Sequence, residues 1–265
     1  MVKRIPSMIL AALALWLCAA SAFAELTVER NEGDMYFPDG KNWVYHFAYA
    51  YPKIAGDDYT AALINDTYQM ALDEMTNLVL PMFANTPDMR FDGKNEVKHD
   101  FAVACNNDKL LSIVLFRSQS MGDETVYSLE PLTFDVSGMY AGETLTLRGV
   151  ILIQAGVDPE RLEDVSAEEY PEIAHIIQGS SDSISEALMP VLYDLFRAHP
   201  NLEDSEKPSL EDFEIEFSPS RDFAALDGQI AFYYPPMLAP EAFRENTIVR
   251  LSPAEIEALL AAAHL

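Results

Sequence analysis

The chain has 265 residues and carries 43 acidic against 17 basic side chains, a net charge of −26. This surplus of carboxylates argues against a nucleic-acid-binding protein, because phosphates are contacted by Lys and Arg. It also disfavours docking on anionic lipid and favours a basic partner through electrostatic steering. The alternative is an acidic, soluble surface that recognises nothing. The length suits one large domain or two small ones, with 49% hydrophobic residues to form a core.

The first 24 residues have the pattern of an export signal. Lys3 and Arg4 precede the apolar run MILAALALWLCAA, and Ser21–Ala24 supplies the small residues that signal peptidase reads. An uncleaved anchor is the less favoured alternative, because the run is shorter than the ~20 residues a membrane span needs. We expect residues 1–24 to be removed, which leaves residues 25–265 as an exported protein, periplasmic or secreted, without a stable membrane anchor.

Only one thiol, Cys105, remains after that cleavage, so the mature chain can form no internal disulfide. Cys105 alternates with Val103 and Phe101, which predicts that the three share one face of a strand. We interpret the thiol as buried and inert and not as a nucleophile. The apolar core must therefore hold the exported fold together.

The N-terminal part of the mature chain predicts one strand and one helix. Residues 25–40 are polar and rich in turn residues. The stretch Asn42–Tyr51 alternates, with Trp, Tyr or Phe at every second position, which predicts a strand with one aromatic face. Packing in the core is a commoner use of such a face than stacking on sugars. A helix begins at Asp57 or Asp58 and is expected to end before Pro81.

The stretch Val97–Val150 predicts an antiparallel meander, because apolar runs of strand length alternate with Asn, Asp and Gly turns. Both faces of Leu110–Phe116 are apolar, so we expect this strand to be covered on both sides. Arg117–Thr125 is polar and predicts a loop, and strands are expected again over Val126–Val136 and Leu145–Val150.

The C-terminal part predicts helices and short strands. Its acidic segment Asp158–Gln178 has a helical pattern with a solvated carboxylate face. The other expected elements are a helix capped by Asp182, a half-exposed strand over Phe213–Phe217, a hairpin of Ile230–Tyr234 with Ile248–Leu251, and a last helix opened by the capping box Ser252–Glu255. These elements together predict a single α+β domain, an antiparallel β-sheet packed by α-helices.

No catalytic motif occurs in the chain. It has no G-x-S-x-G elbow, no glycine-rich phosphate loop and no H-E-x-x-H, and its five histidines are scattered. The sequence therefore predicts no catalytic residue, no metal site and no cofactor. Asp123 and Glu124, adjacent in a predicted loop, are the remaining candidates for general acid and base. They support the alternative of a carboxylate-dependent hydrolase that acts on cell-wall glycan.

Several short motifs, in order and spacing, resemble one family. They are Ala50–Ile54 followed by Ile64-Asn65, then Leu111–Ile113, Thr133–Asp135 with Ser137-Gly138 and Leu145–Leu147, and finally Phe232–Pro235 with Ala239-Pro240 and Val249–Ile256. The family is the extracytoplasmic domain of unknown function found in lysozyme-sensing anti-sigma-V factors and beside peptidoglycan deacetylase domains. The resemblance covers about residues 42–260.

This resemblance implies a non-catalytic domain that recognises a cell-envelope component or a basic, lysozyme-like protein. The chain departs from the family where Met121–Glu124 replaces a Gly-Gly-Ala-His loop, of which only Gly122 matches. We expect binding at a rim formed by the loops Arg117–Thr125 and Pro235–Asn246. The candidate binding residues in or beside them are Gly122, Asp123, Glu124, Tyr127, Tyr233 and Tyr234. The sequence gives no indication of an oligomeric state.

Overall fold

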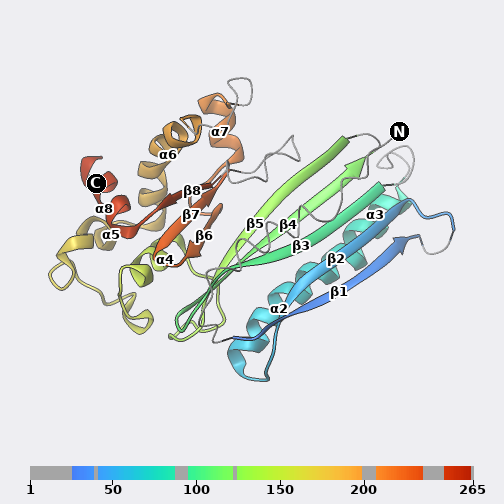
Figure 1. Cartoon of the computed structure of the whole chain (residues 1–265), viewed down its shortest axis with the longest axis horizontal. Coiled ribbons are helices and arrows are strands. Elements are labelled where there is room, and N and C mark those ends of the chain that lie inside the picture. The colour runs from blue at the N-terminus through green and yellow to red at the C-terminus, as the bar shows by residue number, and fades with distance from the viewer. Residues whose placement is uncertain are drawn as a thin grey trace.

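The computed structural model describes residues 26–38, 41–86, 95–121, 124–198, 207–234 and 248–263. The predicted signal sequence lies outside these ranges. A five-stranded and a three-stranded sheet are each accompanied by helices (Figure 1), which confirms the α+β class. Every helix among the described residues is too short or too polar to span a bilayer.

The five-stranded sheet has the order β1-β2-β3-β4-β5. Its strands are β1 (Val28–Phe37), β2 (Tyr45–Ile54), β3 (Asn95–Asn106), β4 (Leu110–Met121) and β5 (Glu124–Asp135). The predicted meander of β3, β4 and β5 is confirmed, and β2 pairs with β3 in parallel. The prediction of turns alone over residues 25–40 is wrong, because β1 lies there. Its residues are half-buried or exposed and none is fully buried, although Val28 and Phe37 pack against the core, and β1 pairs with β2 along its whole length.

The predicted loop Arg117–Thr125 is also wrong. The ladder between β4 and β5 continues from Leu110↔Asp135 to Met121↔Glu124, so the polar residues form the far end of a long hairpin. Polar composition suggested a loop, but strand pairing satisfies main-chain groups whatever the side chains are. Most of the loop expected to form this rim is therefore the paired end of β4 and the start of β5.

Helices cover one face of this sheet (Figure 1): α2 (Tyr59–Glu74), the π-helix η2 (Met75–Val79) and α3 (Leu80–Asn85). The aromatic face of β2 packs against them, with Tyr45, Phe47 and Tyr51 fully buried, as core packing predicts. Asp58 caps α2 by accepting a hydrogen bond from Ala61 N at 2.9 Å. Pro81 does not end the helical segment, because it occupies the first turn of α3, where proline is tolerated.

A second layer lies on the other face of β3, β4 and β5 (Figure 1). It contains a three-stranded antiparallel sheet, which includes the predicted hairpin, and helical segments. Its elements are β6 (Phe223–Leu226), β7 (Gln229–Tyr233), β8 (Ile248–Leu251), α4 (Leu147–Gln154), η4 (Pro159–Arg161), η5 (Pro171–Ile173), α5 (Ala174–Gln178), α6 (Ser181–Arg197), α7 (Leu210–Glu216) and α8 (Pro253–Ala262). β4 is thus covered on both sides, as predicted: Leu111 and Ile113 face α2, and Leu110 and Val114 face the second layer.

Two predicted strands of this layer are helices. Leu145–Val150 gives way to α4, whose cap Thr146 accepts from Gly149 N at 3.3 Å, because a short, continuous apolar run fits a buried helix as well as a strand. Phe213–Phe217 lies mostly in α7, where Phe213 and Phe217, one turn apart, are both buried.

The helix boundaries differ from prediction at two further places. Asp158–Gln178 forms two 3-10 turns and the short α5 instead of a longer helix. α6 is capped by Ser180 in a capping box with Ser183, two residues before the predicted cap Asp182, which lies in the first turn of the helix. The capping box of Ser252 and Glu255 at α8 is confirmed.

Cys105 is buried, but it does not share a face with Phe101 and Val103 as predicted. The register of β3 against β4 shifts between Val103 and Cys105. This bulge turns Cys105 into the core of the second layer, whereas Phe101 and Val103 pack toward α2. Burial raises the pKa of the thiol to about 12, which agrees with an inert thiol.

A helix over Leu210–Glu216 predicts a sharp contrast between neighbouring residues. Phe213→Ala should lower the free energy of unfolding by about 3–5 kcal/mol, because it empties a fully buried site. Ile215→Ala should change it by less than about 0.5 kcal/mol, because Ile215 is 73% exposed. Urea denaturation of both variants checks this, and similar losses for the two would contradict the helix.

Candidate functional site

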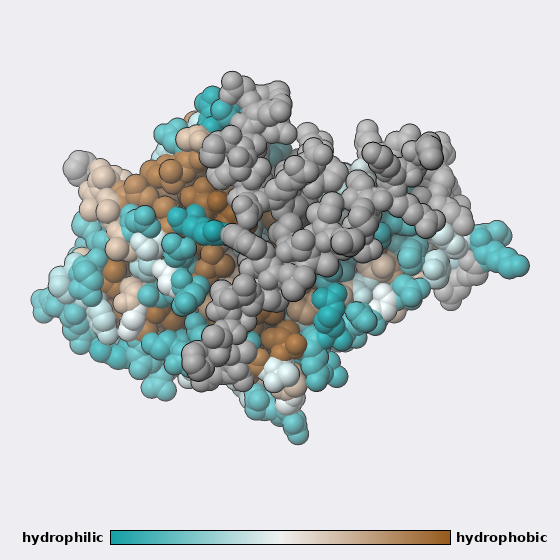
Figure 2. All heavy atoms as spheres, viewed as in Figure 1, coloured by the Kyte–Doolittle hydropathy of each residue, from teal (hydrophilic) through white to brown (hydrophobic). Residues whose placement is uncertain are grey.

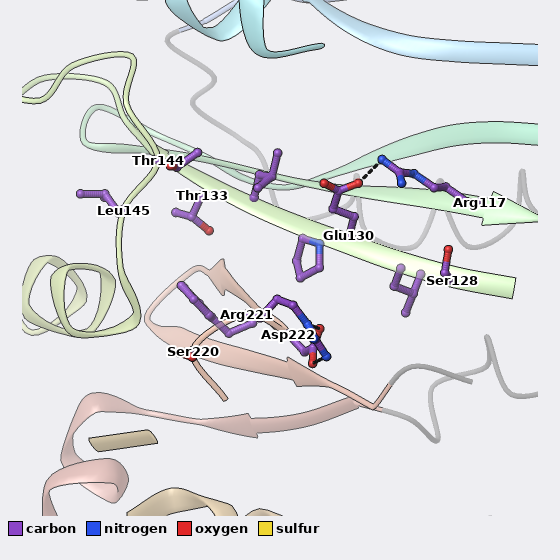
Figure 3. Close-up of a pocket in the computed structure, with 13 residues that line it drawn as sticks. Arg117, Ser128, Glu130, Thr133, Thr144, Leu145, Ser220, Arg221 and Asp222 are labelled. Carbon is purple, nitrogen blue, oxygen red and sulfur yellow. Dashed lines mark hydrogen bonds and ion pairs between the residues drawn. The ribbon is translucent and has the colours of Figure 1, made fainter. Parts of the chain in front are cut away.

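The larger cavity of the described residues is a groove of about 510 Å³ along β5 (Figure 3). Ser128–Thr133 of β5 form one wall, and Ser220–Phe223, the segment that leads into β6, forms the other. Thr144 and Leu145 close one end, and Arg117 lies near the other (Figure 3). The volume is within the range of sites that bind small ligands or short segments.

Two ion pairs lie at this groove. Arg117 contacts Glu130 on the side of the sheet that faces α2, and Arg221 contacts Asp222 on the opposite wall at 2.7 Å (Figure 3). The carboxylate of Asp222 also accepts from Ser218 N at 2.7 Å, so it fixes the turn before β6. The Asp222 carboxylate beside it raises the pKa of Arg221. The oxygens of Asp222 are thus engaged in holding the wall of the groove.

A buried pair of hydroxyl groups lies where the second layer meets the five-stranded sheet. Ser112 Oγ lies 2.8 Å from Thr133 Oγ1, and both residues are almost fully inaccessible. The main-chain N–H of Ala225 in β6 donates to both oxygens, at 3.1 and 3.3 Å. This contact satisfies a buried donor and fixes the second layer against the five-stranded sheet.

A second cavity of about 210 Å³ lies on the helix-covered face, between η2 with α3 and the strands β3, β4 and β5. Met75, Val79 and Phe83 form its apolar wall, and Arg117 and His99 are among its polar lining. Arg117 lines both cavities and therefore separates them. A π-helix beside a cavity is a frequent feature of functional sites.

His99 is the buried titratable group of this second cavity. Its Nδ1 lies 2.6 Å from the Tyr51 hydroxyl, and the side chain is 5% exposed. Burial lowers the pKa of His99 to about 3, with a further contribution from the charge of Arg117. Burial also raises the pKa of Tyr51 to about 12. The pair is thus neutral at ordinary pH and serves as a structural hydrogen bond.

The predicted binding residues do not come together in one place. Gly122 and Asp123 lie outside the described residues, and Glu124 begins β5. Tyr127 lies further along β5 and lines the second cavity. The β4–β5 ladder thus places Glu124 and Tyr127 near its far end.

The two tyrosines at the end of β7 lie elsewhere. Tyr233 is buried against Ala104 and Val114 of the five-stranded sheet. Tyr234 is half-buried, packs against Phe213, and donates a hydrogen bond to Glu216 Oε2 at 2.8 Å. The loop Pro235–Asn246 that follows lies outside the described residues.

The groove residues were missed by sequence reasoning. Arg117 and Glu130 face each other only once the register Leu115↔Glu130 and Arg117↔Ser128 is known. The alternation of side chains along the polar parts of β4 and β5 was the signal that could have placed Arg117 and Glu130 on the same face. The sequence carries no signal that places Arg221 and Asp222 beside β5.

Two motif residues of the resemblance have structural roles. The Asn65 side chain accepts from Ile54 N at 2.7 Å and donates to Ile54 O at 2.9 Å, which ties α2 to β2. Asp135 Oδ1 accepts from the main-chain N–H groups of Ser137 and Gly138 at 3.0 and 2.9 Å and forms the turn after β5. These motifs therefore describe the fold and not a ligand site.

Within the described ranges, no three His, Cys, Asp or Glu side chains gather where they could hold a metal ion. The carboxylates at the groove, Glu130 and Asp222, each contact an arginine. The groove can therefore offer hydrogen bonds, charge pairs and a strand edge to a bound molecule.

Among the comparisons with known proteins, only the comparison with solved structures finds similar proteins. No family model and no curated protein matches the chain. A crystal structure of a DUF3298 family protein from Pseudomonas aeruginosa PAO1 is similar, with 14% identity, 86% of this chain and 89% of that chain covered, and a TM-score of 0.44. A member of the same family from Bacteroides fragilis NCTC 9343 has 15% identity, coverage of 90% and 98%, and a TM-score of 0.41. Similarity at this level carries no argument about function.

The burial of neutral His99 predicts a pH dependence of stability. The unfolded chain takes up a proton at this side chain below about pH 6.5 and the folded chain only near pH 3. The stabilisation is thus complete above pH 6.5 and is lost as the pH falls toward 3. Between pH 7 and pH 5 the wild type should lose about 2 kcal/mol more of its free energy of unfolding than His99→Gln. Urea titrations at both pH values measure this, and equal losses would contradict a neutral, buried His99.

Proposed function

We propose that this protein is a non-catalytic, extracytoplasmic binding domain that recognises a basic partner of the lysozyme type at the cell envelope. The observation that carries the proposal is the unbalanced acidic surface. A net charge of −26 attracts a cationic protein over a distance of about one Debye length and raises its rate of association.

The acidic segment between α4 and α6 concentrates this charge. Six carboxylates in it are exposed: Glu160, Glu163, Asp164, Glu168, Glu169 and Glu172. Arg161 holds Glu169 at 2.7 Å, and in the described part of the chain the other five form no ion pair. Glu163 accepts a hydrogen bond from the Tyr140 hydroxyl and Asp164 lies near Arg161, so Glu160, Glu168 and Glu172 are the carboxylates most available to charges on a partner.

Figure 2 shows that the described residues on the face drawn are mixed in hydropathy. Hydrophilic residues dominate the outer rim of the face drawn, and hydrophobic residues gather over the region of α6. The sequence resemblance to the domain of lysozyme-sensing anti-sigma-V factors supports the same class of partner. The predicted signal sequence supports a role outside the cytoplasm.

Binding to hen egg-white lysozyme tests the proposal. We expect a complex at low salt whose Kd rises about tenfold or more between 50 and 300 mM NaCl, because the attraction between exposed charges is screened. Surface plasmon resonance of residues 25–265 measures it. A basic protein of another fold, such as cytochrome c, is the control for recognition beyond net charge. Absence of a complex, indifference to salt, or release of reducing ends from peptidoglycan by the protein would contradict the proposal.

Two variants that lose the same number of charges at different places test whether the acidic segment attracts the partner. Neutralising Glu160, Glu163, Asp164, Glu168 and Glu172 to their amides should lower the association rate about tenfold at low salt. The control neutralises five exposed carboxylates on the far elements, Glu29, Asp57, Asp66, Glu74 and Asp108. Both variants lose the same net charge, so equal rates for the two would refute a role for the acidic segment.

A further inference from the structure

β5 is the last strand of the five-stranded sheet, and part of its outer edge is open. Over Ser128–Leu132 it pairs with β4 on one side and with no other described strand on the other. These five residues line the 510 Å³ groove (Figure 3); Ser128 is exposed, Leu129, Glu130 and Leu132 are half-buried, and Pro131 is buried. An open edge carries unpaired N–H and C=O groups that can pair with another chain.

The remainder of the same edge already carries an added segment. Asp135 N donates to Glu143 O at 3.1 Å, and Leu145 N donates to Thr133 O at 2.8 Å, on either side of the Phe134↔Thr144 bridge. The main-chain groups of Thr133 and Asp135 thus point outward. Because this direction alternates along a strand, those of Pro131 and Leu129 point outward too. Thr144 and Leu145 line the groove, so it begins where the added segment leaves the edge.

We propose that the groove receives an extended segment of the basic partner, which continues along β5 the ladder that Glu143–Leu145 begins. The Leu129 N–H and C=O would be its main-chain partners, because Leu129 is half-buried and lines the groove, whereas Pro131 is buried. Addition of a strand to a sheet edge is a recurring mode of peptide recognition. The inference rests on the proposed function, and it adds the site and the manner of binding.

The features of the edge favour a different protein over a second copy of this chain. Two copies would each bring a charge of −26 to the contact. Pro131 lacks an N–H, which weakens regular edge-to-edge pairing of two β5 strands. The charges at the groove are balanced within the pairs Arg117–Glu130 and Arg221–Asp222. The acidic surface would therefore bring the partner close, and the strand edge would hold it.

Two substitutions at Leu129 distinguish the contribution of its main-chain N–H to binding from that of its side chain. Leu129→Pro removes the outward N–H, and an edge strand tolerates this because the inward ladder to β4 is retained. Leu129→Ala keeps the N–H and removes most of the side chain. With lysozyme as the probe at low salt, we expect Leu129→Pro to weaken binding tenfold or more and Leu129→Ala to weaken it less than threefold.

Hydrogen exchange of the wild type provides a second measurement that needs no variant. Exchange of the Leu129 amide should slow at least tenfold when lysozyme saturates the protein, because the amide becomes hydrogen-bonded in the complex. Binding by a folded Leu129→Pro at wild-type affinity, or an unchanged exchange rate at Leu129 in the complex, would overturn the edge site and leave the proposed function intact. A wild type that binds no lysozyme at either salt concentration would overturn both.

Discussion

The arrangement of the two layers depends on one buried contact, the N–H of Ala225 shared between the hydroxyls of Ser112 and Thr133. A buried main-chain donor without a partner would cost about 1–3 kcal/mol, so β6 has one favourable position against β4 and β5. That position brings Ser220–Phe223 alongside β5 and creates the groove between them. The groove is thus a consequence of how the layers are joined.

Much of the fold follows from periodicity in the sequence. The aromatic alternation of β2, the meander and the capping box before α8 all have local signals that the structure confirms. β1 was not recognised, because its residues are mostly polar and only Val28 and Phe37 at its two ends pack against the core. α4 and α7 were misread because a short apolar run does not distinguish helix from strand until its packing is known.

The site was less accessible to sequence reasoning than the fold. The groove is assembled from β4, β5, the turn after β5 and the segment before β6, which lie up to a hundred residues apart. Their proximity comes from tertiary packing, for which Arg221 and Asp222 carry no local mark. Likewise, His99 looks like an ordinary polar residue of a strand, and only its burial beside Tyr51 makes it neutral and structural.

The bulge at Val103–Cys105 changes which face Cys105 occupies, so that it packs into the second layer although Phe101 and Val103 pack toward α2. The single thiol of residues 25–265 therefore sits where the layers meet. An alkylating reagent can reach this sulfur only when the layers part. The rate of alkylation of Cys105 therefore reports how often the two layers separate, without any engineered probe.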